Sequence, residues 1–398
     1  MTKQGRKAHC YGPSRPPRPK PNLPEQSRVA FAPGRANSDA LPSMPTPQSR
    51  VAFAPGRVNL IGEHTDYTGG LAMPIAIQLG TTAAFEPELS SSRLELSSDQ
   101  QATTGYLDLQ FIAKSTTDLP AIRPGWIRYA AGVARQLWVQ KRLEPVGGRI
   151  RISSTLPQGA GLSSSAALEL SIGIALGFEG EPVELALACQ RAEQLATGVP
   201  CGVMDQLASA TGVAGCALMM DCARLSIDPV PIPDGIEIAV IHSGQTRKLS
   251  SSAYALRRAE CEQAQNVIGP LSRPGITESD LSDLTDPVLK RRARHVVTEN
   301  RRVAELAQAL KSGDLALAGR IMLASHKSLA QDFEVSTPVL DAMVEKAMAI
   351  PGTLGARLTG AGFGGCIVVI AMSGSLDNSS FPGKFFAVQP SQGARLLS

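Results

Sequence analysis

The chain has 398 residues, enough for two domains with separate hydrophobic cores, because single cores rarely grow beyond about 250–300 residues. Hydrophobic residues make up 43% and charged residues 19% of the sequence, which is typical of a soluble globular enzyme. No apolar run approaches the roughly 20 residues that cross a bilayer, and the seven cysteines form no C-x-x-C pair. We therefore expect a cytoplasmic protein with reduced thiols and no membrane partner.

The formal net charge of +4 arises in the first 48 residues, which hold eight Lys or Arg residues and two acidic ones. The rest of the chain is slightly acidic, and the basic segment has no interleaved aromatic residues, so we expect no nucleic-acid partner. Residues 1–48 are rich in Pro, Arg and Ser and have neither helical nor strand periodicity. They are predicted to form a disordered tail.

This tail contains a repeat. Residues 26–35 read QSRVAFAPGR, and residues 48–57 repeat the same letters identically. Two copies are too few for a solenoid. Only the second copy continues into a polar motif, so we interpret the first as a non-functional duplication or as an over-extended start of the reading frame.

From residue 49 the pattern predicts a mixture of helices and strands. Strands are expected at residues 50–54, 73–77, 148–153, 236–242, 366–371 and 385–388. Helices are expected at residues 126–138, 166–176, 182–196, 291–310, 315–324 and 338–348. Because the two kinds alternate without a strict βαβ cadence, we expect the α+β class, with a domain boundary near residues 220–230.

Residues 54–67, APGRVNLIGEHTDY, gather polar side chains in a loop between apolar strands. Glu63, His64 and Asp66 offer several acceptors and a donor, a combination suited to binding sugar hydroxyls, and such sites discriminate strongly between hydroxyl geometries. A zinc site is one alternative, but the single histidine lacks an i+4 partner. A solvated loop is the other, and it fits poorly with the flanking Leu60 and Ile61.

Two glycine-rich segments follow. Residues 157–167, PQGAGLSSSAA, come after a strand and open a helix, where backbone N–H groups and the helix dipole favour an anion. The segment is neither a Walker A motif nor a Rossmann fingerprint, and a small-residue helix start packed on a sheet is the alternative. Residues 355–366, GARLTGAGFGGC, indicate either a close backbone approach to a ligand or a tight turn before a core strand.

These three segments, in this order, resemble the galactokinase family of the GHMP kinase superfamily. APGRVNLIGEHTDYTGG is similar to the galactokinase signature, PQGAGLSSSAAL to the phosphate loop and GARLTGAGFGGC to the third motif. Four further segments also resemble the family: CQRAEQLATGVPCGVMDQ, SSAYALRRAEC, RARHVVTENRRV and SHKSLAQDFEVSTPVLD. The resemblance covers residues 49–370. It implies an α+β N-terminal kinase domain (49–225), a ferredoxin-like C-terminal domain (226–398) and an active site in the cleft between them.

The resemblance also implies the reaction and its residues. The family phosphorylates galactose at the C1 hydroxyl with ATP and Mg²⁺, the first committed step of the Leloir pathway, and a monomer is expected. Asp205 matches the catalytic base and Arg57 its basic partner, and the Mg²⁺ ligands would be Ser165 and Glu193. Galactose contacts are expected from Glu63, His64, Asp66, Gly202 and Tyr254. ATP contacts are expected from Gly159, Ala160, Gly161, Leu162, Ser163, Ser164 and Ser165.

These roles agree with the chemistry of phosphoryl transfer, which requires mainly positioning and charge neutralisation. Two rival functions stay open: a kinase for N-acetylgalactosamine or arabinose, and a galactose sensor without turnover. Such sensors typically lack residues of the phosphate loop, and the complete SSSAA stretch at residues 163–167 favours an enzyme. His242 stands where the family more often has Asp or Asn, and we expect it to be structural.

The sequence departs most from the family after residue 371. A helix normally precedes the last strand of the ferredoxin-like domain, but residues 372–384 contain two glycines, one proline and four serines. We expect a loop in place of this helix. One face of the strand at 366–371 would then lose its cover, which would make the C-terminal domain the weaker unit.

Overall fold

The computed structural model describes residues 48–398, apart from residues 115–118, 141, 158, 246–249 and 382. The predicted disordered tail and the first copy of the repeat lie outside the described residues, except for Gln48. None of the helices in the described part is long and apolar enough to span a membrane.

The largest sheet has six strands in the order β13-β1-β3-β6-β4-β5. Neighbouring strands are antiparallel except for β4 and β6, which are parallel. The strands are β1 (Arg50–Asn59), β3 (Pro74–Pro87), β4 (Arg93–Ser98), β5 (Gly105–Asp108), β6 (Gly148–Ser154) and β13 (Arg395–Leu396). Buried and exposed residues alternate along β6, so one face of the sheet meets the core and the other meets solvent.

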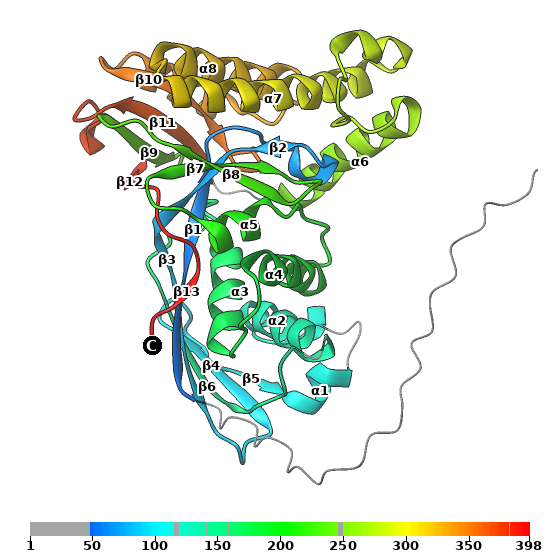
Figure 1. Ribbon diagram of the computed structural model, residues 1–398, viewed down its shortest axis with the longest axis vertical. Helices are drawn as coiled ribbons and strands as arrows, with labels where there is room; N and C mark the ends of the chain where they lie inside the picture. Colours follow the sequence, from blue (N-terminus) through cyan, green and yellow to red (C-terminus); the bar gives the residue numbers. More distant parts are fainter. Residues whose placement is uncertain (1–47, 115–118, 141, 158, 246–249, 382) are drawn as a thin grey trace, which may run out of the picture. The chain divides into compact units, whose positions relative to one another are not determined.

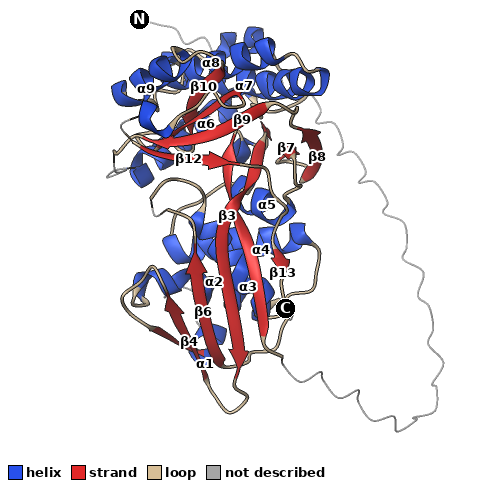
Figure 2. Ribbon diagram, turned by 90° about the vertical axis from the view of Figure 1, so that its left-hand side faces the viewer, coloured by secondary structure: helices blue, strands red, loops and turns tan. Residues whose placement is uncertain are grey.

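Helices cover the buried face of this sheet (Figure 1). They are α1 (Leu109–Lys114), α2 (Arg128–Val139), α3 (Ser164–Ala175), α4 (Pro182–Thr197) and α5 (Met204–Thr211). In Figure 2, β3 and β6 lie in front of α2 and α3. Helix α3 is apolar nearly all round because it packs on β1 and β3 and also on its neighbour α4. Its N-terminus therefore sits at a defined place beside β1.

A second, antiparallel sheet has the order β10-β11-β9-β12. Its strands are β9 (Ile236–His242), β10 (Thr353–Thr359), β11 (Cys366–Met372) and β12 (Lys384–Val388). The helices associated with this sheet are α6 (Ser250–Ile268), α7 (Pro287–Ser312), α8 (Leu315–Gln331) and α9 (Pro338–Met348). Helices α8 and α9 pack on the sheet, α7 packs on α8, and α6 on α7. A small third sheet joins β2 (Leu71–Ala72), β7 (Cys216–Asp221) and β8 (Ser226–Pro231).

Local signals explain where these helices begin and end. The Asp286 side chain accepts hydrogen bonds from the first turn of α7, with Pro287 at the first helical position, and Gly313 ends the helix in a left-handed conformation. Asp314 and Thr337 cap α8 and α9 in the same way. The α+β class is confirmed, as is each predicted helix and strand, with longer bounds for β1, β3, α7 and α8.

The chain returns to its first sheet at the end. Ser391 N donates to the carbonyl oxygen of Ala76, and β13 pairs with β1, where Ala52 lies opposite Leu396. The C-terminal residues therefore belong structurally to the first sheet. The expected division at residues 225 and 226 lies in the turn between β7 and β8, and the two-domain division stays a prediction.

The connection from β11 to β12 is a loop, as expected, with one 3₁₀ turn at Asn378–Ser380. The expectation that β11 loses its cover is wrong, because Cys366–Ala371 is fully buried. Helix α9 contacts this strand. Phe381, which is 6% exposed, belongs to the same buried cluster as Ile367 and Val369, and its ring lies 6.4 Å from that of Phe385. The strand thus stays covered although the connection after it holds no α-helix.

Candidate active site

A cavity of about 560 Å³ lies where β1, the phosphate loop, α4, α5, α6 and the loop after β10 meet. Its walls include Arg57, Glu63, His64, Asp66, Gly159, Gly161, Ser163, Ser164, Ser165, Glu193, Gly202, Asp205 and Tyr254. Ala160 and Leu162 do not line it, because their side chains are buried in the core. Their carbonyl oxygens accept hydrogen bonds from Cys366 Sγ and from the backbone N–H of Arg57.

Arg57 and Asp205 form the centre of the site. Arg57 Nη2 lies 2.6 Å from Asp205 Oδ1, and Arg57 Nη1 donates to the Gly161 carbonyl oxygen at 2.8 Å. The Ser163 hydroxyl donates to the other carboxylate oxygen of Asp205. Asp205 lies in the first turn of α5, where the positive end of the helix dipole favours a carboxylate. Its side chain is 31% exposed, so one face stays open to the cavity.

The phosphate loop folds through left-handed backbone. Gly159 has φ 73°, Gly161 has φ 74° and Ser163 has φ 55°, and α3 begins at the next residue. Ser163 makes no side-chain cap to α3, because its hydroxyl contacts Asp205. The first turn of α3 therefore presents backbone N–H groups next to the cavity, which is the arrangement that binds phosphate oxygens.

Glu193 and Ser165 lie at the other end of the cavity and hydrogen-bond each other. Gln206 Nε2 donates to Glu193 Oε2 at 2.6 Å and to Glu169 Oε2 at 3.2 Å, so one amide bridges two carboxyl groups. Burial raises the pKa of Glu193, and the negative charge of Asp205 raises it further. Glu169 is fully buried, its pKa is raised by burial and by Glu193, and its Oε1 atom has no hydrogen-bond partner.

This end of the cavity fits a hard cation. It gathers carboxyl oxygens and a hydroxyl, the donors that Mg²⁺ takes, and burial makes their negative charge unfavourable without a cation. Within the described residues no group of three or more His, Cys, Asp and Glu side chains could hold a metal. Oxygens of a bound phosphate group would complete such a coordination shell.

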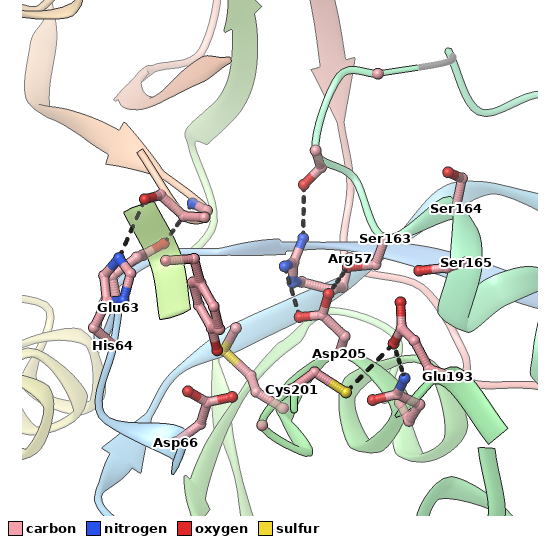
Figure 3. Close-up of a pocket in the computed structure, with 18 of the residues that line it drawn as sticks. Arg57, Glu63, His64, Asp66, Ser163, Ser164, Ser165, Glu193, Cys201 and Asp205 are labelled. Atoms are coloured by element: carbon pink, nitrogen blue, oxygen red, sulfur yellow. Dashed lines mark hydrogen bonds and ion pairs between the residues drawn. The ribbon is translucent and has the colours of Figure 1, made fainter. Parts of the chain in front are cut away.

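Asp66 lies on the opposite side of Asp205 from Glu193, and it packs against Gly202. A Cβ atom at Gly202 would fall 1.6 Å from Asp66 Oδ2, so only glycine leaves room for this carboxylate. Burial and the charge of Asp205 raise the pKa of Asp66 to about 6. Figure 3 shows Arg57 and Asp205 between two groups, Glu63, His64 and Asp66 on one side and Ser164, Ser165 and Glu193 on the other.

Glu63 and His64 line the cavity, but protein groups already bind their polar atoms. Glu63 Oε1 accepts from Gly360 N at 2.9 Å, and its other oxygen pairs with the fully buried Arg357. His64 Nε2 donates to the Ala361 carbonyl oxygen at 3.2 Å, and Nδ1 accepts from the Tyr67 hydroxyl at 3.0 Å. Burial, with His295 nearby, lowers the pKa of His64 to about 3, so the ring is neutral.

Several residues of this region escaped the sequence reasoning. Glu169 lies four residues after Ser165, one turn along α3, so the helical spacing could have indicated it. Gln206 directly follows Asp205, and helical spacing does not mark it because adjacent residues point in different directions. Arg357 stands inside the third glycine-rich segment. His242 also lines the cavity, and its Nδ1 accepts from Gly244 N at 3.0 Å, a contact that stabilises the turn after β9.

A smaller cavity of about 220 Å³ adjoins the phosphate loop and shares Gly159, Ser164 and Ser165 with the main one. Trp126 and Tyr129, near the start of α2, supply aromatic walls. The indole N–H of Trp126 is buried and has no hydrogen-bond partner among the described residues. An aromatic base can stack in such a cavity.

Three family descriptions match the chain. The galactokinase galactose-binding signature matches residues 44–87, the GHMP kinases N terminal domain matches residues 128–213, and the GHMP kinases C terminal domain matches residues 306–378. A galactokinase from Chloroflexus aurantiacus is 41% identical over 333 residues, covering 80% of this chain and 83% of the relative. The Homo sapiens galactokinase is 38% identical over 356 residues, covering 85% and 90%.

Solved structures agree. The galactokinase of Lactococcus lactis complexed with galactose superposes with a TM-score of 0.79 at 31% identity, covering 87% of this chain and 95% of that one. Methanococcus jannaschii mevalonate kinase has the same fold, with a TM-score of 0.64 at 20% identity and coverage of 87% and 100%. The chain therefore belongs to the galactokinase family of the GHMP kinases, and it is an enzyme that phosphorylates galactose.

Proposed function

We propose that the chain transfers the γ-phosphoryl group of ATP to the C1 hydroxyl of galactose, with Asp205 as the general base. The supporting observation is the place of Asp205. It lies between the loop that carries Glu63, His64 and Asp66 and the phosphate loop, and it is held by Arg57 on one oxygen and Ser163 on the other. A carboxylate has lone pairs beyond these two contacts, and its open face meets the cavity.

In this reaction the C1 hydroxyl gives its proton to Asp205, and its oxygen bonds to the γ-phosphorus. The bond from that phosphorus to the bridging oxygen breaks, and ADP leaves. The C1 hydroxyl belongs to a hemiacetal and is more acidic than an ordinary alcohol, so a carboxylate suffices as the base. A positioned base of this kind contributes about 10²–10⁴-fold. Arg57 pairs with this carboxylate and offsets charge on the migrating group.

Ser165 and Glu193 would hold Mg²⁺, which supplies neutralisation of the phosphate charge when it is bound. Gln206 orients Glu193 through the 2.6 Å hydrogen bond. The phosphates would lie at the N-terminus of α3, and the adenine would lie between Trp126 and Tyr129 in the adjoining cavity. On the sugar side Asp66 and Tyr254 offer a carboxylate and a hydroxyl to the sugar. A monomeric state and a cytoplasmic location stay predictions from the sequence.

A coupled assay for ADP tests this proposal with a panel of galactose, N-acetylgalactosamine and arabinose, each with ATP and Mg²⁺. We expect the highest kcat/KM for galactose, and phosphorus NMR of the product should show the phosphate on C1. A higher kcat/KM for another sugar would contradict the proposed substrate. Galactose binding without ADP release would indicate a sensor.

A further inference from the structure

The sugar loop, residues 60–70, holds an unfavourable backbone conformation. Gly62 has φ +92° and His64 has φ 63°, and a left-handed histidine costs free energy that the surroundings must offset. Part of this support is internal, since the Thr65 hydroxyl donates to the carbonyl oxygens of Gly62 and Leu71. The rest comes from a distant part of the chain.

Helix α7 contacts the backbone of this loop and its end at three points. His295 Nε2 donates to the Glu63 carbonyl oxygen at 3.1 Å. Glu299 Oε1 accepts from Gly62 N at 3.1 Å, and Asn300 Oδ1 accepts from Leu71 N at 2.7 Å. His295 and Glu299 lie four residues apart and share one face of α7, and Asn300, next to Glu299 in the chain, lies on the adjoining face. None of the three side chains lines the main cavity.

Glu299 is suited to this role because its charge is buried and fixed. The side chain is fully buried, and it also accepts from Ser325 Oγ at 2.5 Å and from Arg302 Nε at 2.7 Å. Burial alone would raise its pKa, but the positive charges of Arg302, His295 and Arg357 lower it to about 2. Glu299 therefore stays an acceptor on both oxygens, and charged acceptors form the stronger hydrogen bonds.

Arg357 extends the same network to the sugar side. It lies on β10, 3.8 Å from Glu299 Oε1, pairs with the carboxylate of Glu63, and donates to the Leu60 carbonyl oxygen at 3.0 Å. Negative and positive side chains thus alternate from α7 to the cavity wall, as Glu299, Arg357 and Glu63. A change at Glu299 reaches the cavity through this guanidinium and through the Gly62 backbone.

We propose that α7 is the template for the sugar loop, with Glu299, Asn300 and His295 as positioning residues for the galactose site. They lie outside the main cavity. They fix the backbone conformation of the loop that carries Glu63, His64 and Asp66. The inference rests on the proposed place of the sugar. A purely structural role predicts lost stability alone, whereas a template predicts weaker galactose binding in protein that is still folded.

Two pairs of variants test this by calorimetric titration of galactose and, separately, of ATP with Mg²⁺. Glu299→Gln keeps the shape, but an amide accepts at one oxygen only, so its NH₂ group must face either Gly62 N–H or Arg302, both of which donate. We expect at least a ~10-fold weaker galactose Kd and an ATP Kd changed less than about twofold. The matched control is Glu305→Gln on the same helix, where the carboxylate pairs with Arg301 at the surface. It should leave both constants unchanged.

Two variants of Asn300 provide an independent test. Asn300→Leu removes the acceptor for Leu71 N and should weaken galactose binding in the same way. Asn300→Asp keeps that acceptor, and the Ser272 hydroxyl can reverse to donate to it, so binding should be nearly restored. Asp66→Asn is measured beside them. Loss in Asp66→Asn with unchanged galactose Kd in both Glu299→Gln and Asn300→Leu would overturn the template role and leave the proposed function intact. An unchanged galactose Kd in all three of Glu299→Gln, Asn300→Leu and Asp66→Asn would overturn both the template role and the proposed place of the sugar.

Discussion

At the residue scale, the proposed reaction depends on the Asp205 carboxylate, which is held from two sides. Asp205→Asn keeps the shape and the contact with Ser163, but it removes the proton acceptor and the negative partner of Arg57. We expect kcat to fall by at least about 10²-fold, with the galactose Kd little changed. Steady-state kinetics and calorimetric titration on one preparation check this. Near-normal turnover would remove Asp205 as the base.

The ionisation of Asp66 should make galactose binding depend on pH. Burial and Asp205 raise its pKa to about 6, so the carboxyl is neutral below that pH and ionised above it. An ionised carboxylate accepts sugar hydroxyls on both oxygens, whereas the protonated form has fewer acceptor sites. Galactose binding to the nucleotide-free enzyme should therefore weaken as the pH falls through about 6, by up to about tenfold per pH unit.

The control for this prediction is Asp66→Asn, which should bind galactose weakly and without this pH dependence. His64 does not interfere, because its pKa of about 3 lies well below the range. Calorimetric titration between pH 5 and 7.5 measures the effect. A wild-type galactose Kd that stays constant over the range would show that Asp66 does not titrate in contact with the sugar.

At the scale of elements, a buried aromatic side chain anchors the loop that stands in place of a helix. Phe381 follows the 3₁₀ turn between β11 and β12 and belongs to the buried cluster that includes Ile367 and Val369. Phe381→Ala should lower the free energy of unfolding by about 3–5 kcal/mol, the usual loss for a buried phenylalanine. Leu376→Ala, which removes a partly buried side chain from the same loop, should cost less.

Hydrogen exchange locates that loss. In the wild type we expect β11 and β6 to be protected alike, because β11 is buried and paired on both edges. In Phe381→Ala the amides of β11 should exchange through a lower-energy opening, while those of β6 keep their protection. Equal changes in both strands would mean that the two sheets unfold as one cooperative unit.

At the scale of the whole molecule, all the proposed site residues belong to the part of the chain after the first copy of the repeated segment. Strand β1 begins at Arg50, within the second copy of QSRVAFAPGR, and the proposed catalytic and binding residues lie between Arg57 and Ala361. Deleting residues 1–47 should therefore leave kcat, both KM values and the melting temperature unchanged. Thermal unfolding and kinetics of the shortened chain test this. A large loss of any of them would give the first copy a role in the enzyme.

Much of this protein follows from local sequence. The glycines at 159 and 161 allow the left-handed turns of the phosphate loop, Pro287 and Gly313 delimit α7, and alternation along residues 148–153 identifies β6. Such signals act over a few residues, because turns, caps and periodicity depend on neighbours in the chain. The family resemblance then named the residues of the cavity, and the structure brings all of them to it except Ala160 and Leu162.

Tertiary structure decided the contacts between residues that lie far apart in the sequence. Arg57 meets Asp205 across 148 positions, and Gly62 meets Glu299 across 237, and no local pattern predicts such pairs. The same applies to Glu63, whose carboxylate binds Arg357 within the protein, and to β11, whose full burial reverses the expectation of an uncovered strand. These contacts depend on how sheets and helices pack, because burial sets both the partner and the charge state of each group. The sequence by itself determined the elements and the chemistry of the loops, and only packing decided which of these groups face the substrate and which hold the others in place.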